Sequence, residues 1–519
     1  MSRVQSAVEQ VIRQRVLQHP DETWLKWKDE QISWKEMLSN IQRAANGLLE
    51  LGVRPGDRVA IMMANRPQFL WAHFGVNLIG AHTVPINISQ RGVTLQHILA
   101  DSDSVAVIFQ DDLRDALLAM HDDLPSLRHT VVYGGPAGNG ADWDFDRLMA
   151  GDDREPPIDV EEPSTGVGMM YTSGTTGPPK GVVATKYDTG PIMTLLQASG
   201  VQAGETMYTP LPLFHGNALF VSAIGSMLLD AKFALGERFS ASRFWDDCRK
   251  YEAVQFNSLG GMISILLKQP PSPNDRDHQV RVVLSAGCPP DRWEEFQDRF
   301  GVRIIEWFGM VDAPGILLNE VGKVGSMGKP VADLEFRVVD NDQPLGPNQV
   351  GELEFRHPLG QLTEYNKLPE ATEEAYRGGW FHSGDLAEYD EEGFFYYRGR
   401  KKESMRRLGE NISAWEIETV VNQHPKVLES AAHAVESELG EDEVKIAVVS
   451  QPGERPTPEE VLDFCKGKMA YYAIPRYVEL VESLPKTETQ RVQYATLKER
   501  GITEQTWDRE KAGYKVERA

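Results

Sequence analysis

The sequence predicts an α/β fold: a large N-terminal domain of parallel βαβ sheets with a small barrel-like subdomain, then a small α+β C-terminal domain. Three observations support this prediction. The chain has 519 residues, too many for a single hydrophobic core. Residues 57–133 alternate short β-rich runs with helical patterns, which is typical of parallel sheet built from βαβ units. After about residue 330 the pattern changes to short strands separated by Gly and Asp turns.

The elements of the parallel sheets are expected in two parts of the chain. The first part has strands and helices in alternation, at Arg58–Met63, Pro67–Ile79, Ala81–Pro85, Val93–Ala100 and Val105–Phe109. The same rhythm returns at 254–300, with a strand at Arg281–Ser285 and a helix at Asp291–Phe300. Residues 135–163 are rich in Gly, Pro, Asp and Glu and are expected to form surface loop.

The later part of the chain is predicted to hold the subdomain and the second domain. The expected strands of the subdomain are Leu334–Val339, Gly351–Arg356 and Phe394–Arg398. A short charged stretch follows, and we place the domain boundary there, near Lys402, which gives domains of residues 1–401 and 402–519. The elements expected after it are a helix at Ala414–Gln423, a strand at Ile446–Ser450 and a helix at Pro458–Met469.

Composition argues against several classes of partner and compartment. The net charge of −23 argues against binding to nucleic acid or to anionic membranes, because both need a basic face. No run approaches the ~18–20 apolar residues that span a bilayer, and the polar N-terminus does not resemble a signal peptide. The three cysteines are widely spaced, which argues against a disulfide framework or a structural zinc site. We expect a cytoplasmic protein.

Residues 171–182 form the most informative stretch and read Tyr-Thr-Ser-Gly-Thr-Thr-Gly-Pro-Pro-Lys-Gly-Val. Glycines allow positive φ angles and a close approach of the backbone to a ligand. Successive backbone N–H groups beside Ser and Thr hydroxyls make an anion-binding concavity, and Lys180 adds a positive charge. The stretch is therefore predicted to bind phosphate, although it is not a G-x-x-x-x-G-K-[ST] loop. A plain surface loop is the alternative, which the specific residue order disfavours.

The stretch resembles the phosphate loop of the adenylate-forming enzymes, which include acyl-CoA synthetases, luciferases and the adenylation domains of peptide synthetases. Further motifs follow in the family's order, at Pro212–His215, Ser285–Pro289, Phe308–Met310, Gly351–Leu353, Ser383–Asp385, Gly399–Arg400, Gly409–Ile412 and Leu484–Thr487. The resemblance implies an acid–thiol ligase of the acyl-CoA synthetase branch, which activates a carboxylic acid as its acyl-adenylate. It also implies that the C-terminal domain is a mobile lid that rotates about a hinge at Lys402.

By this resemblance the chain binds ATP, or acyl-AMP and AMP. Asp385 would accept hydrogen bonds from the ribose hydroxyls, because one carboxylate accepts two O–H groups; an aspartate that caps a turn is the alternative. Ser285–Pro289 would lie along the adenine, or else form an ordinary strand-to-helix loop. The implied nucleotide-binding residues are Thr172, Ser173, Gly174, Thr175, Thr176, Gly177, Lys180, Gly287, Cys288, Pro289, Phe308, Gly309, Met310, Val311, Asp385 and Arg400.

His215 matches an aromatic position that lies at the acyl pocket of related acyl-CoA synthetases and moves between the two half-reactions. A packed, hydrogen-bonded histidine without a role in the reaction is the alternative. Relatives that activate amino acids carry an aspartate near here to hold the ammonium group. Because Pro212–Asn217 contains none, a carboxylic acid without an amino group is favoured. The expected pocket walls are His215, Phe220, Ser258, Gly260, Gly261, Trp307 and Met310.

Residues 406–413, Arg-Arg-Leu-Gly-Glu-Asn-Ile-Ser, are the candidate region for thioester formation with coenzyme A. A glycine lets the narrow pantetheine arm pass close to the backbone, and arginines could meet the CoA phosphates. A solvated basic face is the alternative for the two arginines. The stretch resembles ligases of the carnitine/crotonobetaine type, which favours CoA chemistry. The implied CoA-binding residues are Arg406, Arg407, Gly409, Glu410 and Asn411, and Gly409 is expected to be catalytic, as is His215.

The sequence departs from the family at residues that serve adenylation. The family's Pro-Lys-Thr-x-x-Gly-Lys motif ends in a lysine that bridges the carboxylate and the α-phosphate, but here Gln490 and Arg491 replace the glycine and the lysine. After Phe308–Met310, relatives continue with a threonine on the phosphate and a glutamate on Mg²⁺, whereas this chain has Val311 and Asp312. We expect Arg491 to be the catalytic cation and Asp312 a weak metal ligand. Loss of one donor aimed at transition-state charge typically costs about 10²–10³ in rate.

We therefore hypothesise that the protein transfers the acyl group of an acyl-adenylate to CoA, while its own adenylation step is weak or lost. A separate adenylating enzyme would then supply the adenylate. The residues of the second half-reaction, such as Gly409 and Asn411, are retained. Three alternatives stay open: a complete ATP-dependent synthetase, a relative that binds nucleotide without turnover, and an enzyme that acylates a carrier protein. The identity of the acid cannot be predicted from the sequence.

Overall fold

The computed structural model describes residues 7–516, apart from 89, 91, 119, 159–167, 173–178, 187, 260, 402–403, 408–409, 437–441, 467, 470–472 and 488–489. The chain forms two compact units. The first comprises Met1–Glu335 and Arg356–Gly379, and the second comprises Phe336–Phe355 and Trp380–Ala519. Lys402 lies outside the described residues, so the predicted hinge stays a prediction, as does the boundary at that residue.

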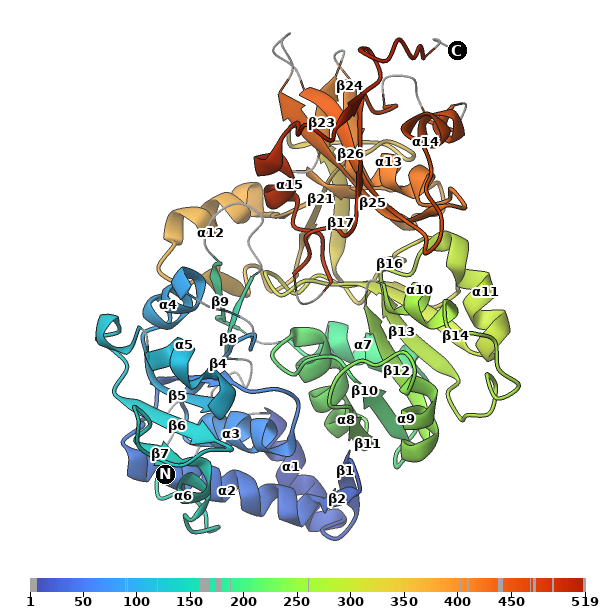
Figure 1. The fold of residues 1–519 in the computed structure, drawn as a ribbon. Helices are drawn as coiled ribbons and strands as arrows, with labels where there is room; N and C mark the ends of the chain where they lie inside the picture. The colour runs from blue at the N-terminus through green and yellow to red at the C-terminus, as the bar shows by residue number, and fades with distance from the viewer. Residues whose placement is uncertain are drawn as a thin grey trace. The chain divides into compact units, whose positions relative to one another are not determined.

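A five-stranded parallel sheet forms one part of the first unit, coloured blue to cyan in Figure 1. Its strands, in spatial order, are β4 (His82–Pro85), β3 (Arg58–Met62), β5 (Ser104–Gln110), β6 (His129–Tyr133) and β7 (Trp143–Asp144). Helices α3 (Pro67–Leu78) and α4 (Gly92–Asp101) connect the first three of these strands along the chain. The predicted elements from 58 to 109 are confirmed to within one residue at each end.

The stretch 135–163, expected to be loop, contains both β7 and the short helix α6 (Phe145–Met149). The expectation of loop throughout was therefore wrong for this part. Asp144 caps the helix by accepting a hydrogen bond of 2.8 Å from the backbone N–H of Arg147, and Phe145 and Leu148 are buried. Two apolar residues at helical spacing are enough for one turn that packs against the core, and the surrounding Gly and Asp residues obscured them.

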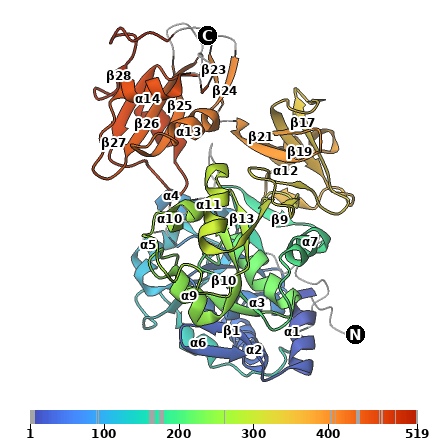
Figure 2. The same ribbon diagram turned by 90° about the vertical axis from the view of Figure 1, so that its right-hand side faces the viewer.

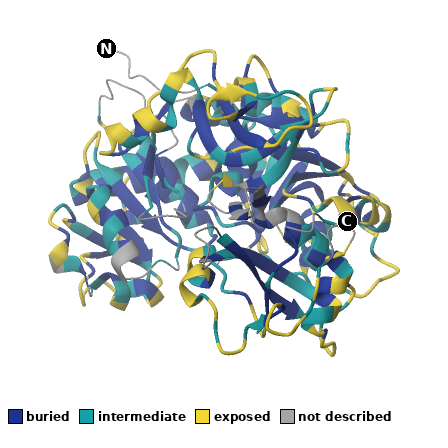
Figure 3. Ribbon diagram, turned by 90° about the horizontal axis from the view of Figure 1, so that it is seen from above, coloured by how far each residue is buried: buried dark blue, intermediate teal, exposed yellow. Residues whose placement is uncertain are grey.

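A nine-stranded sheet forms the other part of the first unit. Its order is β16 (Lys329–Pro330), β15 (Leu317–Asn319), β14 (Arg303–Phe308), β13 (Val282–Ala286), β12 (Ala253–Leu259), β10 (Thr206–Thr209), β11 (Lys232–Leu235), β1 (Thr23–Trp27) and β2 (Glu30–Ser33). The six strands from β14 to β1 are parallel, and antiparallel strands close both edges. The strands of the molecule are largely buried, with exposed residues gathered on loops (Figure 3).

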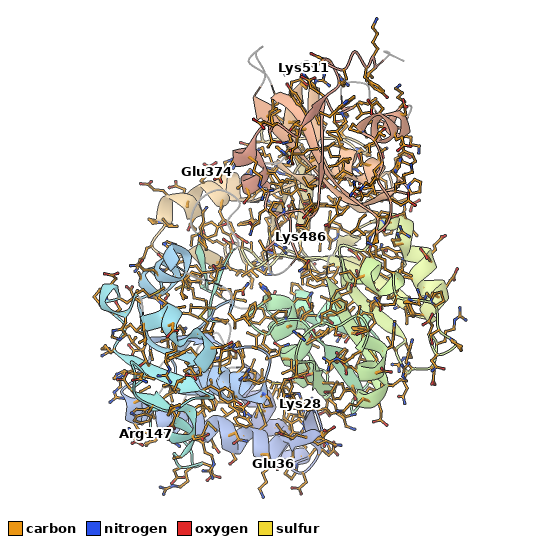
Figure 4. The ribbon with its side chains drawn as sticks, viewed as in Figure 1. Lys28, Glu36, Arg147, Glu374, Lys486 and Lys511 are labelled. Carbon is orange, nitrogen blue, oxygen red and sulfur yellow. The ribbon has the colours of Figure 1, made fainter. Side chains whose placement is uncertain are left out.

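Helices cover the sheets of the first unit. They are α1 (Ala7–Gln18), α2 (Trp34–Leu51), α7 (Gly190–Ala198), α8 (Gly225–Leu228), α9 (Phe244–Tyr251), α10 (Met262–Leu267) and α11 (Pro290–Phe300), with the π-helix η3 at Asn217–Ile224. Helix α2 packs against α3. It begins with a capping box between Ser33 and Glu36 (labelled in Figure 4) and ends at Gly52, whose φ of 111° suits glycine.

A small three-stranded sheet completes the first unit and was not predicted. Its order is β20 (Thr363–Tyr365), β9 (Gly181–Ala184) and β8 (Met169–Tyr171), and helix α12 (Pro369–Ala375) follows β20. The β8–β9 hairpin pairs Tyr171 with Gly181, and β20 pairs Tyr365 with Val182. Residues far apart in the sequence are thereby brought to the predicted phosphate loop.

The second unit contains the predicted short strands as a five-stranded sheet (Figure 2). Its order is β18 (Gln343–Pro344), β17 (Glu335–Asp340), β19 (Gly351–Arg356), β21 (Phe381–Tyr389) and β22 (Phe395–Arg400). Neighbours β19 and β21 are antiparallel, as are β21 and β22. Phe336, Phe355 and Phe395 pack together on this sheet, since their ring centroids lie 5.0 and 5.9 Å from that of Phe336.

The rest of the second unit is α+β, as predicted. The hairpin β23 (Ser404–Arg407) and β24 (Glu410–Ser413) is followed by the sheet β25 (Val427–Glu436), β26 (Asp442–Ser450), β27 (Tyr477–Val481) and β28 (Trp507–Asp508). Helices α13 (Ala414–Val421), α14 (Pro458–Cys465) and α15 (Tyr494–Arg500) accompany these strands. Ile417, Ile446 and Leu462 meet in its core. Across the described part of the chain, no helix has the length and apolarity needed to cross a membrane.

Candidate functional site

The predicted phosphate loop joins β8 to β9 as a closed hairpin. The backbone N–H of Thr172 donates to the carbonyl oxygen of Lys180 at 3.0 Å, and the N–H of Lys180 reaches Oγ1 of Thr172 at 3.4 Å. The two residues therefore face each other where the loop begins and ends. The other loop residues predicted to bind phosphate, Ser173, Gly174, Thr175, Thr176 and Gly177, lie outside the described residues.

Helix α4 anchors this hairpin from one side. Nε2 of His97 lies 2.9 Å from the carbonyl oxygen of Pro179. The hydroxyl of Tyr171 donates to Oδ2 of Asp101 at 2.6 Å, and burial together with Asp101 raises the pKa of Tyr171. The phenol is therefore protonated at neutral pH and stays a donor. Both contacts fix the residues that flank the loop, Tyr171 and Pro179.

Strand β20 connects the hairpin to the predicted metal ligand. Nζ of Lys180 lies 4.5 Å from the centre of the Tyr365 ring, and the Tyr365 hydroxyl donates to Oδ1 of Asp312 at 2.8 Å. Thr363 donates to the backbone carbonyl of Asp312, and its hydroxyl lies 2.7 Å from that of Tyr376. The structure thus brings Lys180 and Asp312 to the same tyrosine. A carboxylate held in this way is a suitable ligand for Mg²⁺, which prefers oxygen.

The adenine loop predicted at 285–289 follows β13 and precedes α11. The backbone N–H groups of Gly287 and Cys288 both donate to the carboxyl group of Glu306, and the Cys288 bonds measure 3.2 Å. Gly287 has a φ of 97°, which favours glycine. Burial raises the pKa of Glu306 to about 8, against the effect of these N–H groups. Glu306 was not predicted as a site residue, although a glutamate between apolar residues of a buried strand is an unusual signal.

The carboxyl ends of three neighbouring parallel strands lie side by side at this point. Ser258 on β12 pairs with Ser285 on β13, which pairs with Glu306 on β14. The loops that continue these strands hold the predicted residues Gly261, Pro289 and Gly309, while Gly260 lies outside the described residues. In open α/β sheets, ligands bind outside the carboxyl ends of the strands. This edge of the sheet is therefore the expected place of the nucleotide and acyl group.

Trp307 and Met310, both predicted as pocket walls, are separated in the chain by Phe308 and Gly309. A Cβ atom built at Gly309 would lie 2.7 Å from Cζ3 of Trp307, so the Trp307 ring passes the backbone where no side chain can stand. Trp307 is buried, whereas Phe308 and Met310 are half-buried. Ser258 is also buried. Their assignment to the acyl pocket stays a prediction.

His215 begins a segment that contacts Val311. Its ring lies 4.8 Å from that of Phe214, centroid to centroid, in an edge-on arrangement. A Cβ atom at Gly216 would lie 3.2 Å from Cδ2 of Phe220 and 3.4 Å from Cγ2 of Val311. Phe220 belongs to the π-helix η3, a rare element that is frequent at functional sites. Val311 therefore presents methyl groups to the segment predicted to border the acyl pocket.

In the second unit, Asp385 is buried on β21. The residue before it, Gly384, has a φ of 67°, which favours glycine, and the backbone N–H of Asp385 donates to Oγ of Ser383 at 3.0 Å. Glu352 accepts the Gly384 N–H at 3.3 Å and the ammonium of Lys401 at 2.7 Å. In the strand pairing, Asp385 lies opposite Arg400. Asp385 and Arg400, both predicted to bind the nucleotide, are thus neighbours on adjacent strands.

A second group of potential metal ligands lies in the same unit. Asp342, Glu354 and His382 each offer one ligand atom within 4.8 Å of the others. Glu354 already has a cation, however, because Nε of Arg337 donates to its carboxylate at 2.7 Å. We assign no metal to this group.

The predicted CoA-binding residues belong to the β23–β24 hairpin. Arg406 pairs with Asn411 and Arg407 with Glu410 in the strand register, whereas Gly409 lies outside the described residues. The side chain of Arg407 is buried: its Nε lies 2.9 Å from Oε2 of Glu443. Its Nη1 donates to the carbonyl oxygen of Ile474 at 3.3 Å. The CoA role of these residues stays a prediction, and for Arg407 it requires that this ion pair open.

In the motif at 484–491, of which 488 and 489 lie outside the described residues, backbone hydrogen bonds bring Thr487, Gln490 and Arg491 together. The N–H of Thr487 donates to the carbonyl of Arg491 at 2.8 Å, and the N–H of Gln490 donates to the carbonyl of Thr487 at 2.9 Å. Gln490 has a φ of 61°, which favours glycine, the residue that the family's motif has here. The ammonium of Lys486 (labelled in Figure 4) contacts the carboxylate of Glu429, and Arg491 is exposed.

Comparison with known families identifies the fold and the chain's relatives. The model of the family described as AMP-binding enzyme matches residues 12–365, and that of the AMP-binding enzyme C-terminal domain matches residues 416–491. The chain belongs to the AMP-binding enzyme family. Crotonobetaine/carnitine–CoA ligase of Salmonella enteritidis PT4 (strain P125109) is 30% identical over 483 residues, which cover 88% of this chain and 91% of the relative. The corresponding ligase of Shigella dysenteriae serotype 1 (strain Sd197) is 31% identical over 478 residues and covers 88% and 90%.

Solved structures of AMP-binding enzymes share this fold. The anthranilate CoA ligase AuaEII, in complex with anthranoyl-AMP, superposes with a TM-score of 0.85 at 23% identity over 96% of this chain and 98% of its own. The o-succinylbenzoate CoA synthetase MenE of Bacillus subtilis, in complex with ATP and a magnesium ion, superposes with a TM-score of 0.80 at 26% identity. The match covers 94% of this chain and 99% of MenE. The predicted α/β fold, the resemblance to adenylate-forming enzymes and the class of acid–thiol ligase are confirmed.

Proposed function

We propose that this AMP-binding enzyme forms an acyl-CoA thioester from an acyl-adenylate and coenzyme A, and that its own adenylation of the acid is weak or lost. The acid is a carboxylic acid without an amino group. A separate adenylating enzyme in the cytoplasm would supply the acyl-adenylate. ATP, and Mg²⁺ held by Asp312, would serve what remains of the first half-reaction.

The second half-reaction needs few groups from the protein. The CoA thiolate attacks the acyl carbon, a C–S bond forms, and the bond from the acyl carbon to the phosphate oxygen breaks with AMP as the leaving group. Thiolates are good nucleophiles near neutral pH, so the protein mainly positions the two reactants and stabilises charge. Lys180 beside the phosphate loop and buried Asp385 are suited to the phosphate and ribose of the adenylate.

The contact of Val311 with Gly216 carries the proposal of weak adenylation. Val311 takes the place of a threonine that meets the phosphate in the family, and a methyl group cannot donate a hydrogen bond. Its Cγ2 lies 3.4 Å from where a Cβ atom at position 216 would stand, and the residue is 37% exposed. Arg491 also supports weak adenylation, because a planar guanidinium does not reproduce the compact charge of the lysine that it replaces.

A complete ATP-dependent synthetase is the second candidate, and one observation favours it. Asp312 is held by Tyr365 at 2.8 Å, which is how a carboxylate that binds a metal is commonly oriented. In this reading Asp312 and Arg491 replace glutamate and lysine adequately. The curated relatives are also named as CoA ligases without further restriction.

Two assays on the purified protein separate these functions. One follows ATP–pyrophosphate exchange with a panel of carboxylic acids, and the other follows thioester formation from synthetic acyl-AMP and CoA. We expect the protein to form the thioester from acyl-AMP and CoA but to show no ATP–pyrophosphate exchange. The double variant Arg491→Lys with Asp312→Glu should partly restore this exchange. Exchange and thioester together would support the complete synthetase. Binding of AMP without either reaction would indicate a non-catalytic relative, and thioester on a phosphopantetheinyl carrier alone would replace CoA as the acceptor.

A further inference from the structure

Tyr365 contacts two charged residues that come from distant parts of the chain. Its ring lies under the ammonium of Lys180, 4.5 Å from Nζ to the ring centre, and its hydroxyl donates to Oδ1 of Asp312 at 2.8 Å. Lys180 ends the phosphate loop, and Asp312 follows the end of β14. One side chain on β20 therefore determines where a cation and a carboxylate stand relative to each other.

The position of Tyr365 is itself fixed by β20. This strand pairs with β9, which begins directly after Lys180, and Tyr365 lies opposite Val182 in the register. The N–H of Tyr365 donates to Oγ1 of Thr372 at 2.9 Å, which ties the strand to helix α12. Thr363, two residues earlier on the same strand, donates to the backbone carbonyl of Asp312. Asp312 is thus held by its backbone and by its carboxylate from one strand.

The chemistry of the tyrosine suits both contacts. A phenol is protonated at neutral pH, so the hydroxyl of Tyr365 donates to the carboxylate of Asp312. The donated bond occupies one carboxylate oxygen and orients the other, as partners of metal ligands commonly do. The face of the ring attracts the Lys180 ammonium without neutralising it, in contrast to a carboxylate, so that Lys180 keeps its charge for a phosphate.

We propose that Tyr365 is a positioning residue that orients Lys180 toward the phosphates of a nucleotide and Asp312 toward the Mg²⁺ that accompanies them. This inference rests on the proposed nucleotide-binding function. The ring and the hydroxyl have separable tasks: the ring acts on phosphate affinity through Lys180, and the hydroxyl acts on metal affinity through Asp312. A tyrosine that only fills space would affect both in the same way or neither.

Two substitutions of Tyr365 separate these tasks. Calorimetry on the full chain would measure the affinity for ATP in excess Mg²⁺, for ATP in EDTA, and for AMP. Tyr365→Phe keeps the ring and removes the hydroxyl; we expect about tenfold weaker binding of ATP in Mg²⁺ and less than about twofold change in EDTA. Tyr365→Leu removes both, and we expect ATP binding in EDTA to weaken several-fold as well.

Tyr376→Phe is the matched control, because it removes a hydroxyl that lies 2.7 Å from that of Thr363 and leaves Tyr365 itself unchanged. It should leave both ATP affinities within about twofold, and retained AMP binding in each variant reports an intact fold. The inference is overturned if Tyr365→Phe weakens ATP equally in Mg²⁺ and EDTA, or has no effect. It is also overturned if Mg²⁺ gives the wild type no gain in ATP affinity. A wild type that binds neither ATP nor AMP would instead overturn the proposed function itself, and the inference with it.

Discussion

The carboxyl group of Glu306 accepts the backbone N–H group of Gly287. It also accepts that of Cys288, so one buried side chain on β14 holds the loop that follows β13. This loop is the one expected along the adenine. The arrangement places an ionisable group directly behind the proposed nucleotide site.

Glu306 should make stability depend on pH. Burial raises its pKa from 4.5 to about 8, so the folded protein retains a proton that the unfolded chain has lost between these values. The protonated Glu306 therefore contributes to the free energy of unfolding in full below pH 4.5, and this contribution is lost as the pH rises to about 8. Each unit of difference between the folded and unfolded pKa corresponds to about 1.4 kcal/mol. Glu306→Gln keeps the shape and cannot ionise. Urea denaturation at pH 5 to 8 should show the wild type weakening relative to this variant; parallel curves would contradict the assignment.

Gly216→Ala should narrow the space beside Val311. The glycine has helical angles (φ −56°, ψ −34°) that alanine accepts, so only space decides the outcome. The new Cβ would press on Phe220 and Val311, at 3.2 and 3.4 Å. We expect kcat/KM for thioester formation to fall about tenfold for bulky acyl-adenylates, the size expected for about 1.4 kcal/mol of overpacking, while AMP affinity stays unchanged.

The double variant Gly216→Ala with Val311→Ala is the control for this prediction. The second substitution returns the space that the new methyl group takes. It should therefore restore kcat/KM for bulky acyl-adenylates. An equal loss with small and bulky acids, or a loss that the second substitution does not relieve, would show that the segment does not border the acyl group.

Gln490 should be replaceable by glycine without loss of structure. At a φ of 61° a side chain costs about 1–2 kcal/mol, partly offset because glycine is more flexible when unfolded. Hydrogen exchange of the hydrogen-bonded N–H groups of Thr487 and residue 490 should therefore slow or stay equal in Gln490→Gly. It should accelerate in Gln490→Val, since β-branched residues tolerate this region least. Faster exchange in the glycine variant would mean that the glutamine side chain stabilises the turn.

The sequence was sufficient for the parallel sheets because their elements are short and periodic. Arg58–Met62 and Pro67–Leu78 were predicted almost to the residue from apolar pattern, and a proline marks the helix start. The hairpin around the phosphate loop was missed, because its second strand is only four residues long and its partner β20 lies far along the chain. Local pattern carries no information on such pairing.

The site was predictable only where residues act in contiguous motifs. Lys180, Asp385 and Arg491 stand in recognisable strings, so their candidacy could be read from the sequence. Glu306 and Tyr365 act through tertiary contacts with Gly287 and Asp312, at separations that no motif spans. The left-handed backbone of Gln490 is not suggested by glutamine itself, and only the glycine of the family's motif at this position points to it.

The most direct measurement of the central claim compares two routes to one product in a single enzyme preparation. Single-turnover formation of acyl-CoA would be timed from acyl-AMP plus CoA, and from the free acid plus ATP, Mg²⁺ and CoA. We predict that the first route is faster by about 10²-fold or more, because Val311 and Arg491 replace groups that serve adenylation in the family. Equal rates by both routes would contradict it and identify a complete acyl-CoA synthetase.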